Sequence, residues 1–136
     1  MTVINDSTGA ELAESFLQGV VNEPMRAATK LLGAHSDGFW LRRFAGDHAL
    51  AAAAGHALID HSGRYPTVDW EGVGLLLKSP GWSGDASRSQ VAVVEFAASL
   101  VNRCPVQLGQ VSGAVDDAEF QLLLRALEEA TYGDAR

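Results

Sequence analysis

Residues 116–133 read DDAEFQLLLRALEEATYG and contain the clearest helix signals in the chain. Asp116 and Glu119 have the spacing of a capping box, in which two side chains satisfy free backbone N–H groups at a helix start. Gly133 stands where a glycine commonly ends a helix. Apolar residues recur between these ends at helical spacing, which predicts one inward face. The residues expected on that face are Phe120, Leu123, Leu124 and Leu127.

Similar start signals occur toward the N-terminus. Thr8 and Glu11 have capping-box spacing, and Asn22 followed by Pro24 is typical of a helix start. Asp47 can cap a helix over residues 48–60, and Thr67 or Asp69 can cap the apolar segment after it. A broad apolar face over residues 91–101 indicates a central helix, with Ser83 or Asp85 as its expected cap. Gly33 is expected to stop the helix that follows Asn22.

These patterns predict an all-α fold. We expect a compact bundle of five to seven helices without a significant sheet, because the sequence contains no series of alternating strands and no internal repeat. With 136 residues, 47% of them hydrophobic, the chain can bury an ordinary core as one domain over residues 1–136. Residues 1–7 and 134–136 are expected to form flexible tails.

Charge and cysteine content restrict the function. The formal net charge is −7, and residues 1–25 and 104–136 each contribute −4. Such an acidic balance disfavours nucleic acid as a partner and suits either a basic protein partner or simple solubility. Cys104 is the single cysteine, which excludes an internal disulfide and a cysteine-based zinc site. No signal-peptide pattern and no bilayer-length apolar run occur, so we expect a cytoplasmic location without a membrane.

The densest cluster of chemically active side chains is His48, His56, Asp60 and His61. On one helix, His56 and Asp60 would share a face, and the carboxylate could orient the imidazole. A metal-dependent enzyme or metal binder that uses this region is therefore one alternative. The spacing matches no established ligand motif, and no other catalytic set converges in the sequence. We therefore expect no metal, no cofactor and no catalytic residue.

Aromatic and arginine side chains near turns suggest protein binding, because Tyr, Trp and Arg are enriched at binding hot spots. The candidate protein-binding residues are Arg64, Tyr65, Trp70, Trp82, Trp40, Arg42 and Arg43. The alternative is that the tryptophans pack inward, which leaves Tyr65 as the best candidate for exposure. The leading hypothesis is a small acidic helical module that binds another protein or a second copy of itself, as an adaptor, inhibitor, immunity or regulatory factor. A helical DNA-binding regulator, with Arg42, Arg43 and Arg64 on a basic face, is a further alternative that the net charge opposes.

Overall fold

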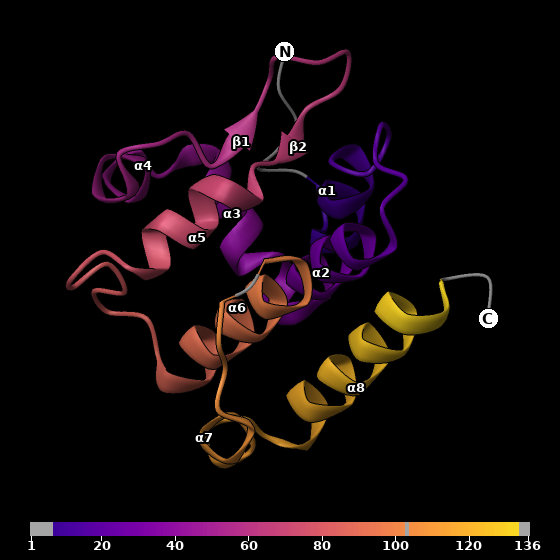
Figure 1. The fold of residues 1–136 in the computed structure, drawn as a ribbon, viewed down its shortest axis with the longest axis vertical. Coiled ribbons are helices and arrows are strands. Elements are labelled where there is room, and N and C mark those ends of the chain that lie inside the picture. The colour runs from indigo at the N-terminus through magenta and orange to yellow at the C-terminus, as the bar shows by residue number, and fades with distance from the viewer. Residues whose placement is uncertain (1–6, 103, 134–136) are drawn as a thin grey trace.

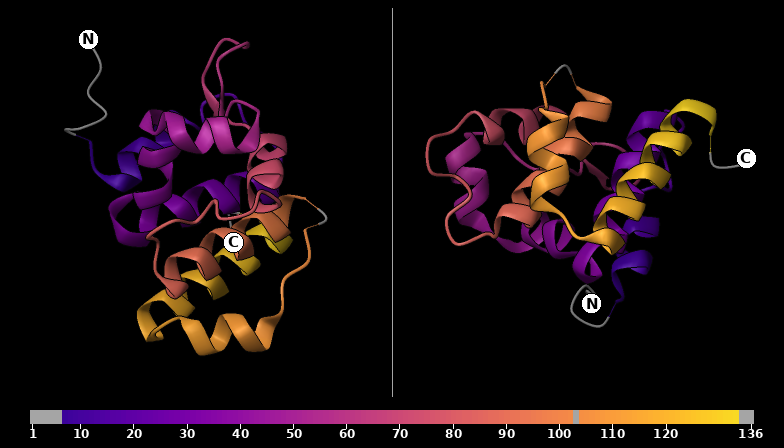
Figure 2. Two further views of the ribbon diagram at one scale, coloured as in Figure 1. Left: turned by 90° about the vertical axis from the view of Figure 1, so that its left-hand side faces the viewer. Right: turned by 90° about the horizontal axis from the view of Figure 1, so that it is seen from below.

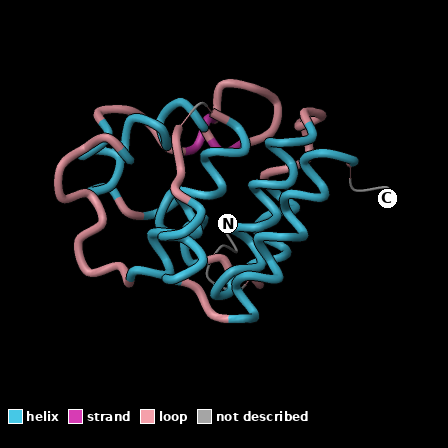
Figure 3. The backbone as a smooth tube through the Cα atoms, turned by 60° about the horizontal axis from the view of Figure 1, so that its bottom comes forward, coloured by secondary structure: helices cyan, strands magenta, loops and turns pink. Residues whose placement is uncertain are grey.

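A computed structural model describes residues 7–102 and 104–133. Within these residues the backbone forms eight α-helices, a short 3-10 helix and one pair of two-residue strands (Figure 1, Figure 3). In chain order they are α1 (Gly9–Ser15), α2 (Glu23–Ala34), η1 (His35–Asp37), α3 (Phe39–Gly46), α4 (His48–Ala54), β1 (Ile59–Asp60), β2 (Thr67–Val68), α5 (Trp70–Leu77), α6 (Arg88–Val101), α7 (Leu108–Ala114) and α8 (Asp117–Tyr132).

The prediction of a mostly helical fold is confirmed, with two corrections. The helices are more numerous than the expected five to seven, and β1 pairs with β2 in an antiparallel hairpin, Ile59 opposite Val68. The helix expected over residues 48–60 ends at Ala54, because Gly55 adopts a left-handed conformation with φ of 66°. The expected flexible tails, residues 1–7 and 134–136, lie outside the described residues except for Ser7. The Ser7 carbonyl accepts a hydrogen bond from Arg42 at 2.6 Å.

Local capping explains where most helices begin. Both predicted capping boxes form: Thr8 with Glu11 before α1, and Asp116 with Glu119 before α8. The expected caps Asn22, Asp47 and Asp69 also accept hydrogen bonds from backbone N–H groups of α2, α4 and α5. The start of α6 differs from the prediction. Its cap is Ser87, which forms a capping box with Gln90, and not Ser83 or Asp85.

Helix α2 is the central packing element. It contacts α1, α6 and α8, and its buried residues include Ala27, Ala28, Leu31 and Leu32. Figure 1 shows α8 at the lower right of the molecule and the β1–β2 hairpin at the top. Among the described residues, no helix combines the length and the apolar character needed to span a bilayer.

Helices α1 and α2 approach so closely that their contact requires glycine. A Cβ atom added to Gly33 would lie 2.5 Å from the Ala13 Cβ and 2.8 Å from the Gly9 carbonyl oxygen. A Cβ atom on Gly9 would collide with the Gly33 carbonyl. Gly33 lies inside α2, which ends at Ala34, so its role is to admit α1 rather than to stop the helix.

Gly33→Ala should therefore destabilise the protein. Because the added methyl group meets backbone as well as Ala13, the helices must separate, and overpacking of this kind typically costs about 1–3 kcal/mol. The matched control is Gly113→Ala in α7, where no atom lies within 4 Å of the added Cβ. This control should be neutral or stabilising by about 0.4–1 kcal/mol. Urea denaturation followed by circular dichroism measures both, and equal midpoints for parent and Gly33→Ala would contradict the assignment.

The orientation of α8 differs from the prediction. Its buried residues are Leu123 and Ala126, whereas Phe120, Leu124 and Leu127 have exposed fractions of 39%, 42% and 47%. Ala126, Leu31 and Ala34 line one cavity between α8 and α2. The small side chain of Ala126 faces α2 and allows the two helices to pack closely. This packing turns Leu124 and Leu127 away from the core.

Candidate functional site

The tryptophans of the predicted protein-binding set belong mainly to the core. Trp40 is fully buried and donates a hydrogen bond from Nε1 to the Gln90 carbonyl oxygen at 2.8 Å. Trp70 is 4% exposed, and Trp82 is partly buried with its ring 5.5 Å from that of Trp40. Trp40 and Trp70 are therefore core residues in this conformation, as the alternative interpretation of the tryptophans expects.

Arg42 and Arg43 are held by contacts within the chain. The Arg42 guanidinium donates to the carbonyl oxygens of Asp37 and Ser7 and to the Asp37 carboxylate at 3.2 Å. Arg43 pairs with Asp47 at 2.9 Å, and its guanidinium also lies 5.3 Å from the Trp40 ring centre. The arginine lowers the pKa of the Asp47 carboxyl by donating hydrogen bonds to it. Both arginines thus stabilise the fold around α3, which weakens the hypothesis of a basic DNA-binding face.

Arg64 and Tyr65 are the exposed part of the predicted set. Both lie in the loop between β1 and β2, where the Arg64 guanidinium is 5.5 Å from the Tyr65 ring centre. Tyr65 is 40% exposed, and one edge of its ring lies beside Gly19. This loop projects from the body of the molecule in Figure 1 and Figure 2.

Replacing both Arg64 and Tyr65 with alanine should change stability little. Exposed side chains outside a packed core usually shift the unfolding free energy by about 0.5 kcal/mol or less, although the contact with Gly19 adds a small cost. Trp70→Ala is the contrasting variant and should cost about 3–5 kcal/mol, because its side chain is buried. Thermal unfolding of the two variants measures the difference. A large loss of stability in the double variant would show that the loop supports the fold.

The structure separates the side chains of the alternative histidine site. His48 begins α4, His56 follows the end of that helix, and Asp60 lies in β1, so His56 and Asp60 do not share a helix face. His56 Nδ1 donates to the Ala57 carbonyl oxygen at 2.8 Å, and the Asp69 carboxylate lies 3.7 Å away. Nowhere in residues 7–102 and 104–133 do three or more His, Cys, Asp or Glu side chains gather as a metal site would require.

Local hydrogen bonds explain the pKa shifts in this region. The bond from His56 to the Ala57 carbonyl, aided by the charge of Asp69, raises the pKa of that imidazole. Hydrogen bonds from Ser62 lower the pKa of the Asp60 carboxyl, and one of them comes from its backbone N–H at 2.8 Å. These contacts connect the end of α4, the turn after it and the hairpin.

Helix α8 exposes three large apolar side chains on one side, those of Phe120, Leu124 and Leu127. We call these three residues the outer face of α8. With 3.6 residues per turn, these positions fall within about 60° of one another around the helix axis. Three large apolar side chains, each 39–47% exposed, thus form a continuous row along α8. The prediction missed this face because it placed the same residues in the core. The run Leu122-Leu123-Leu124 was the available signal, since three consecutive leucines cannot all point inward.

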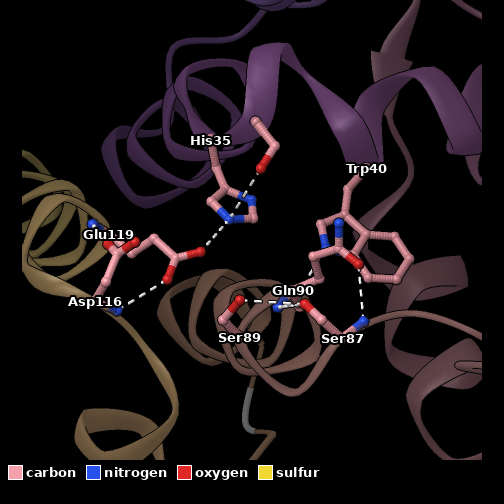
Figure 4. Close-up of polar contacts among 8 residues, drawn as sticks. His35, Trp40, Ser87, Ser89, Gln90, Asp116 and Glu119 are labelled. Carbon is pink, nitrogen blue, oxygen red and sulfur yellow. Dashed lines mark hydrogen bonds and ion pairs between the residues drawn. The ribbon is translucent and has the colours of Figure 1, made fainter.

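A buried polar contact fixes the orientation of α8 (Figure 4). His35 is 2% exposed, and its Nε2 lies 2.8 Å from Oε2 of Glu119, across 84 residues of sequence. The other carboxylate oxygen of Glu119 accepts the Asp116 backbone N–H at 3.0 Å. Glu119 therefore completes its helix cap and also joins α8 to the end of α2. This double role holds Phe120, one residue later, toward solvent.

Neighbouring contacts extend this anchor to α6. Partial burial acts to raise the pKa of the Glu119 carboxyl, but hydrogen bonds from the Asp116 backbone, His35 and Ser89 outweigh it and lower the pKa. The Ser87 and Ser89 hydroxyls lie 3.2 Å apart at the start of α6 (Figure 4). Trp40 bonds to the Gln90 carbonyl in the same turn. The N-terminal helices, α6 and α8 thus meet around one small polar network.

Glu119→Ala should destabilise the protein by about 1–3 kcal/mol, because buried His35 loses its partner and the helix cap loses one of its bonds. The matched control is Glu128→Ala, which removes an exposed glutamate from the same helix and should change the unfolding free energy by about 0.5 kcal/mol or less.

The stabilising effect of Glu119 should depend on pH, because the folded state lowers the pKa of its carboxyl. Its contribution is therefore complete above the ordinary value near 4.5 and is lost as pH falls through the lowered pKa. Urea denaturation at neutral and acidic pH measures this. A stability difference between the two variants that is unchanged in acid would contradict the role of the ionised Glu119 carboxylate.

Comparison with family models, with curated proteins and with solved structures finds no match to this chain.

Proposed function

We propose that the protein is a protein–protein interaction module that binds its partner through the outer face of α8. The observation that supports this most is the row of Phe120, Leu124 and Leu127, which the fold holds against solvent at 39–47% exposure. Contiguous exposed apolar groups of this kind mark interaction sites in soluble proteins. Burying them against a partner would remove apolar area from water, the main favourable contribution to association.

The surroundings of the outer face support an interface. A shallow depression runs along α8, lined by Leu122, Leu124, Leu127 and Tyr132 together with Gln121, Arg125, Glu128 and Thr131. Such a mixture of apolar and polar groups is compatible with a protein interface, since interfaces as a whole are about as apolar as the rest of a protein surface. The helix that carries the face is anchored by Glu119 and packs on α2, so the side chains are presented from a rigid element. A rigid surface loses little conformational freedom on binding.

The loop between β1 and β2 is not part of the proposed interface on α8. The loop between β1 and β2 projects at the top of Figure 1, away from α8 at the lower right, so one partner of ordinary size can cover the outer face without reaching the loop. The two surfaces can therefore be tested separately.

The proposal predicts that a photo-crosslinking amino acid at position 124 captures a discrete protein in cells of the source organism. The matched control carries the same group at Leu75, which is 41% exposed on α5 and lies outside the proposed surface. The captured protein is then purified and titrated against the parent and against Leu124→Gln/Leu127→Gln. Loss of two central apolar contacts should weaken binding about 30-fold or more. Equal crosslinking at both positions, or equal affinity of the variant, would refute the outer face as the interface.

A further inference from the structure

We infer that the occupant of the outer face of α8 is a basic amphipathic helix of another protein, and not a second copy of this chain. This inference rests on the proposed function and adds the chemical character of the partner. It depends on the charges that surround Phe120, Leu124 and Leu127.

The rim of the outer face is acidic. Helical geometry places Asp117 about 60° and Glu128 about 80° around the axis from Phe120, directly beside the apolar row. Both side chains are exposed. Arg125, the single cation of α8, lies about 140° from Phe120 and is thus farther from the row than either acid. Arg125 and Glu128 line the same depression beside the row, and Asp117 gives this rim its net negative charge.

The C-terminal end of α8 adds to this negative potential. Unpaired carbonyl groups give the end of a helix a partial negative charge, which basic side chains commonly offset. The last turn of α8 has no basic residue and follows Glu128 and Glu129. The Glu23 carboxylate also lies beside Gly133, since a Cβ atom on that glycine would be 2.7 Å from Glu23 Oε2. Lys30 approaches Glu129 at 3.9 Å from the inner side of the helix. Cationic groups of a partner would be stabilised along the outer side.

The same charges oppose a symmetric dimer. In a two-fold interface the same patch serves both subunits, so the rim of one copy lies against the rim of the other. Each copy would bring Asp117 and Glu128 against only Arg125, within chains that each carry a net charge of −7. Like charges across an interface suppress that pairing. Basic side chains on a partner would instead neutralise both acids.

The shape of the outer face favours a helix as the partner. Helix α8 has 16 residues and is therefore about 24 Å long. Its apolar row at positions i, i+4 and i+7 forms a ridge beside the groove that contains Leu122 and Arg125. Rows of this kind pack against the rows of a second helix. An amphipathic helix of about four turns, with leucine-like residues on one face and lysine or arginine beside them, matches both the apolar row and the acidic rim.

The test uses synthetic peptides of about 18 residues, long enough for five helical turns. One is a leucine–lysine peptide with amphipathic helical spacing. The second has the same composition in scrambled order, and the third replaces every lysine with glutamate. Fluorescence anisotropy should show saturable one-to-one binding of the amphipathic basic peptide only. Binding should be at least about tenfold weaker for each of the other two, because they lack either the apolar face or the complementary charge.

Variants of the protein separate the two contributions. Leu124→Gln/Leu127→Gln keeps the charge and should weaken binding of the amphipathic basic peptide at least about tenfold, while Leu75→Gln should bind like the parent. Asp117→Asn/Glu128→Gln keeps the apolar row and should reduce the salt dependence of binding. Equal binding of the scrambled peptide, or parent-like binding by Leu124→Gln/Leu127→Gln, would overturn the inference.

Light scattering distinguishes this inference from the proposed function. A stable dimer that Leu124→Gln/Leu127→Gln dissolves would show that the outer face is an interface but that a second copy occupies it. The proposed surface would then stand, and the basic partner would be refuted. A monomer that binds the basic amphipathic peptide through this face supports both. A monomer that binds none of the peptides refutes the basic helix, and the crosslinking experiment alone then decides the proposed function.

Discussion

The fold depends on how closely α1 can lie against α2. At their crossing, the backbone of Gly9 faces the backbone of Gly33, and neither position has room for a side chain. Helix α2 also contacts α6 and α8, and residues of α1, α2 and α8 together line one cavity. One helix of 12 residues thus contacts α1, α3, α6 and α8 and organises the core. A bulkier residue at Gly9 or Gly33 would push α1 away from α2. This displacement would also change the contacts at the end of α2, where His35 begins the turn into α3.

The contact between Glu119 and His35 determines which side of α8 is buried and which side is exposed. Glu119 must face His35 and close its own helix cap, so the rotation of α8 is determined within its first turn. Ala126 then faces the core two turns later, and Phe120, Leu124 and Leu127 face solvent. Exposing three large apolar side chains is unfavourable for the isolated chain. A fold that enforces this orientation with a buried polar pair therefore presents the apolar row as a defined surface.

Signals that act within a few residues were predictable from the sequence. Thr8, Asn22 and Asp116 cap helices as expected, because a capping side chain needs only the N–H groups that follow it. Positions that depend on tertiary packing were not predictable. The sequence pattern places Leu124 in the core because leucine is more hydrophobic than alanine. In the structure Ala126 is buried and Leu124 is exposed. Trp40 and Trp70 lie near turns in the sequence, but the core reaches those turns. The helix after Asp47 was expected to be longer, since nothing local distinguishes Gly55 in a left-handed conformation from a tolerated helical glycine.

The distance along the chain between α2 and α8 has a consequence for synthesis. His35 and Glu119 are separated by 84 residues, and nearly every other helix is translated between them. At translation rates of about 5–20 residues per second, the side of α2 that α8 covers stays open for several seconds after α2 leaves the ribosome. During that time its apolar residues are accessible to chaperones or to other nascent chains. Because α8 is translated after α1, α3 and α6, its contact with α2 is the last of these four to become possible.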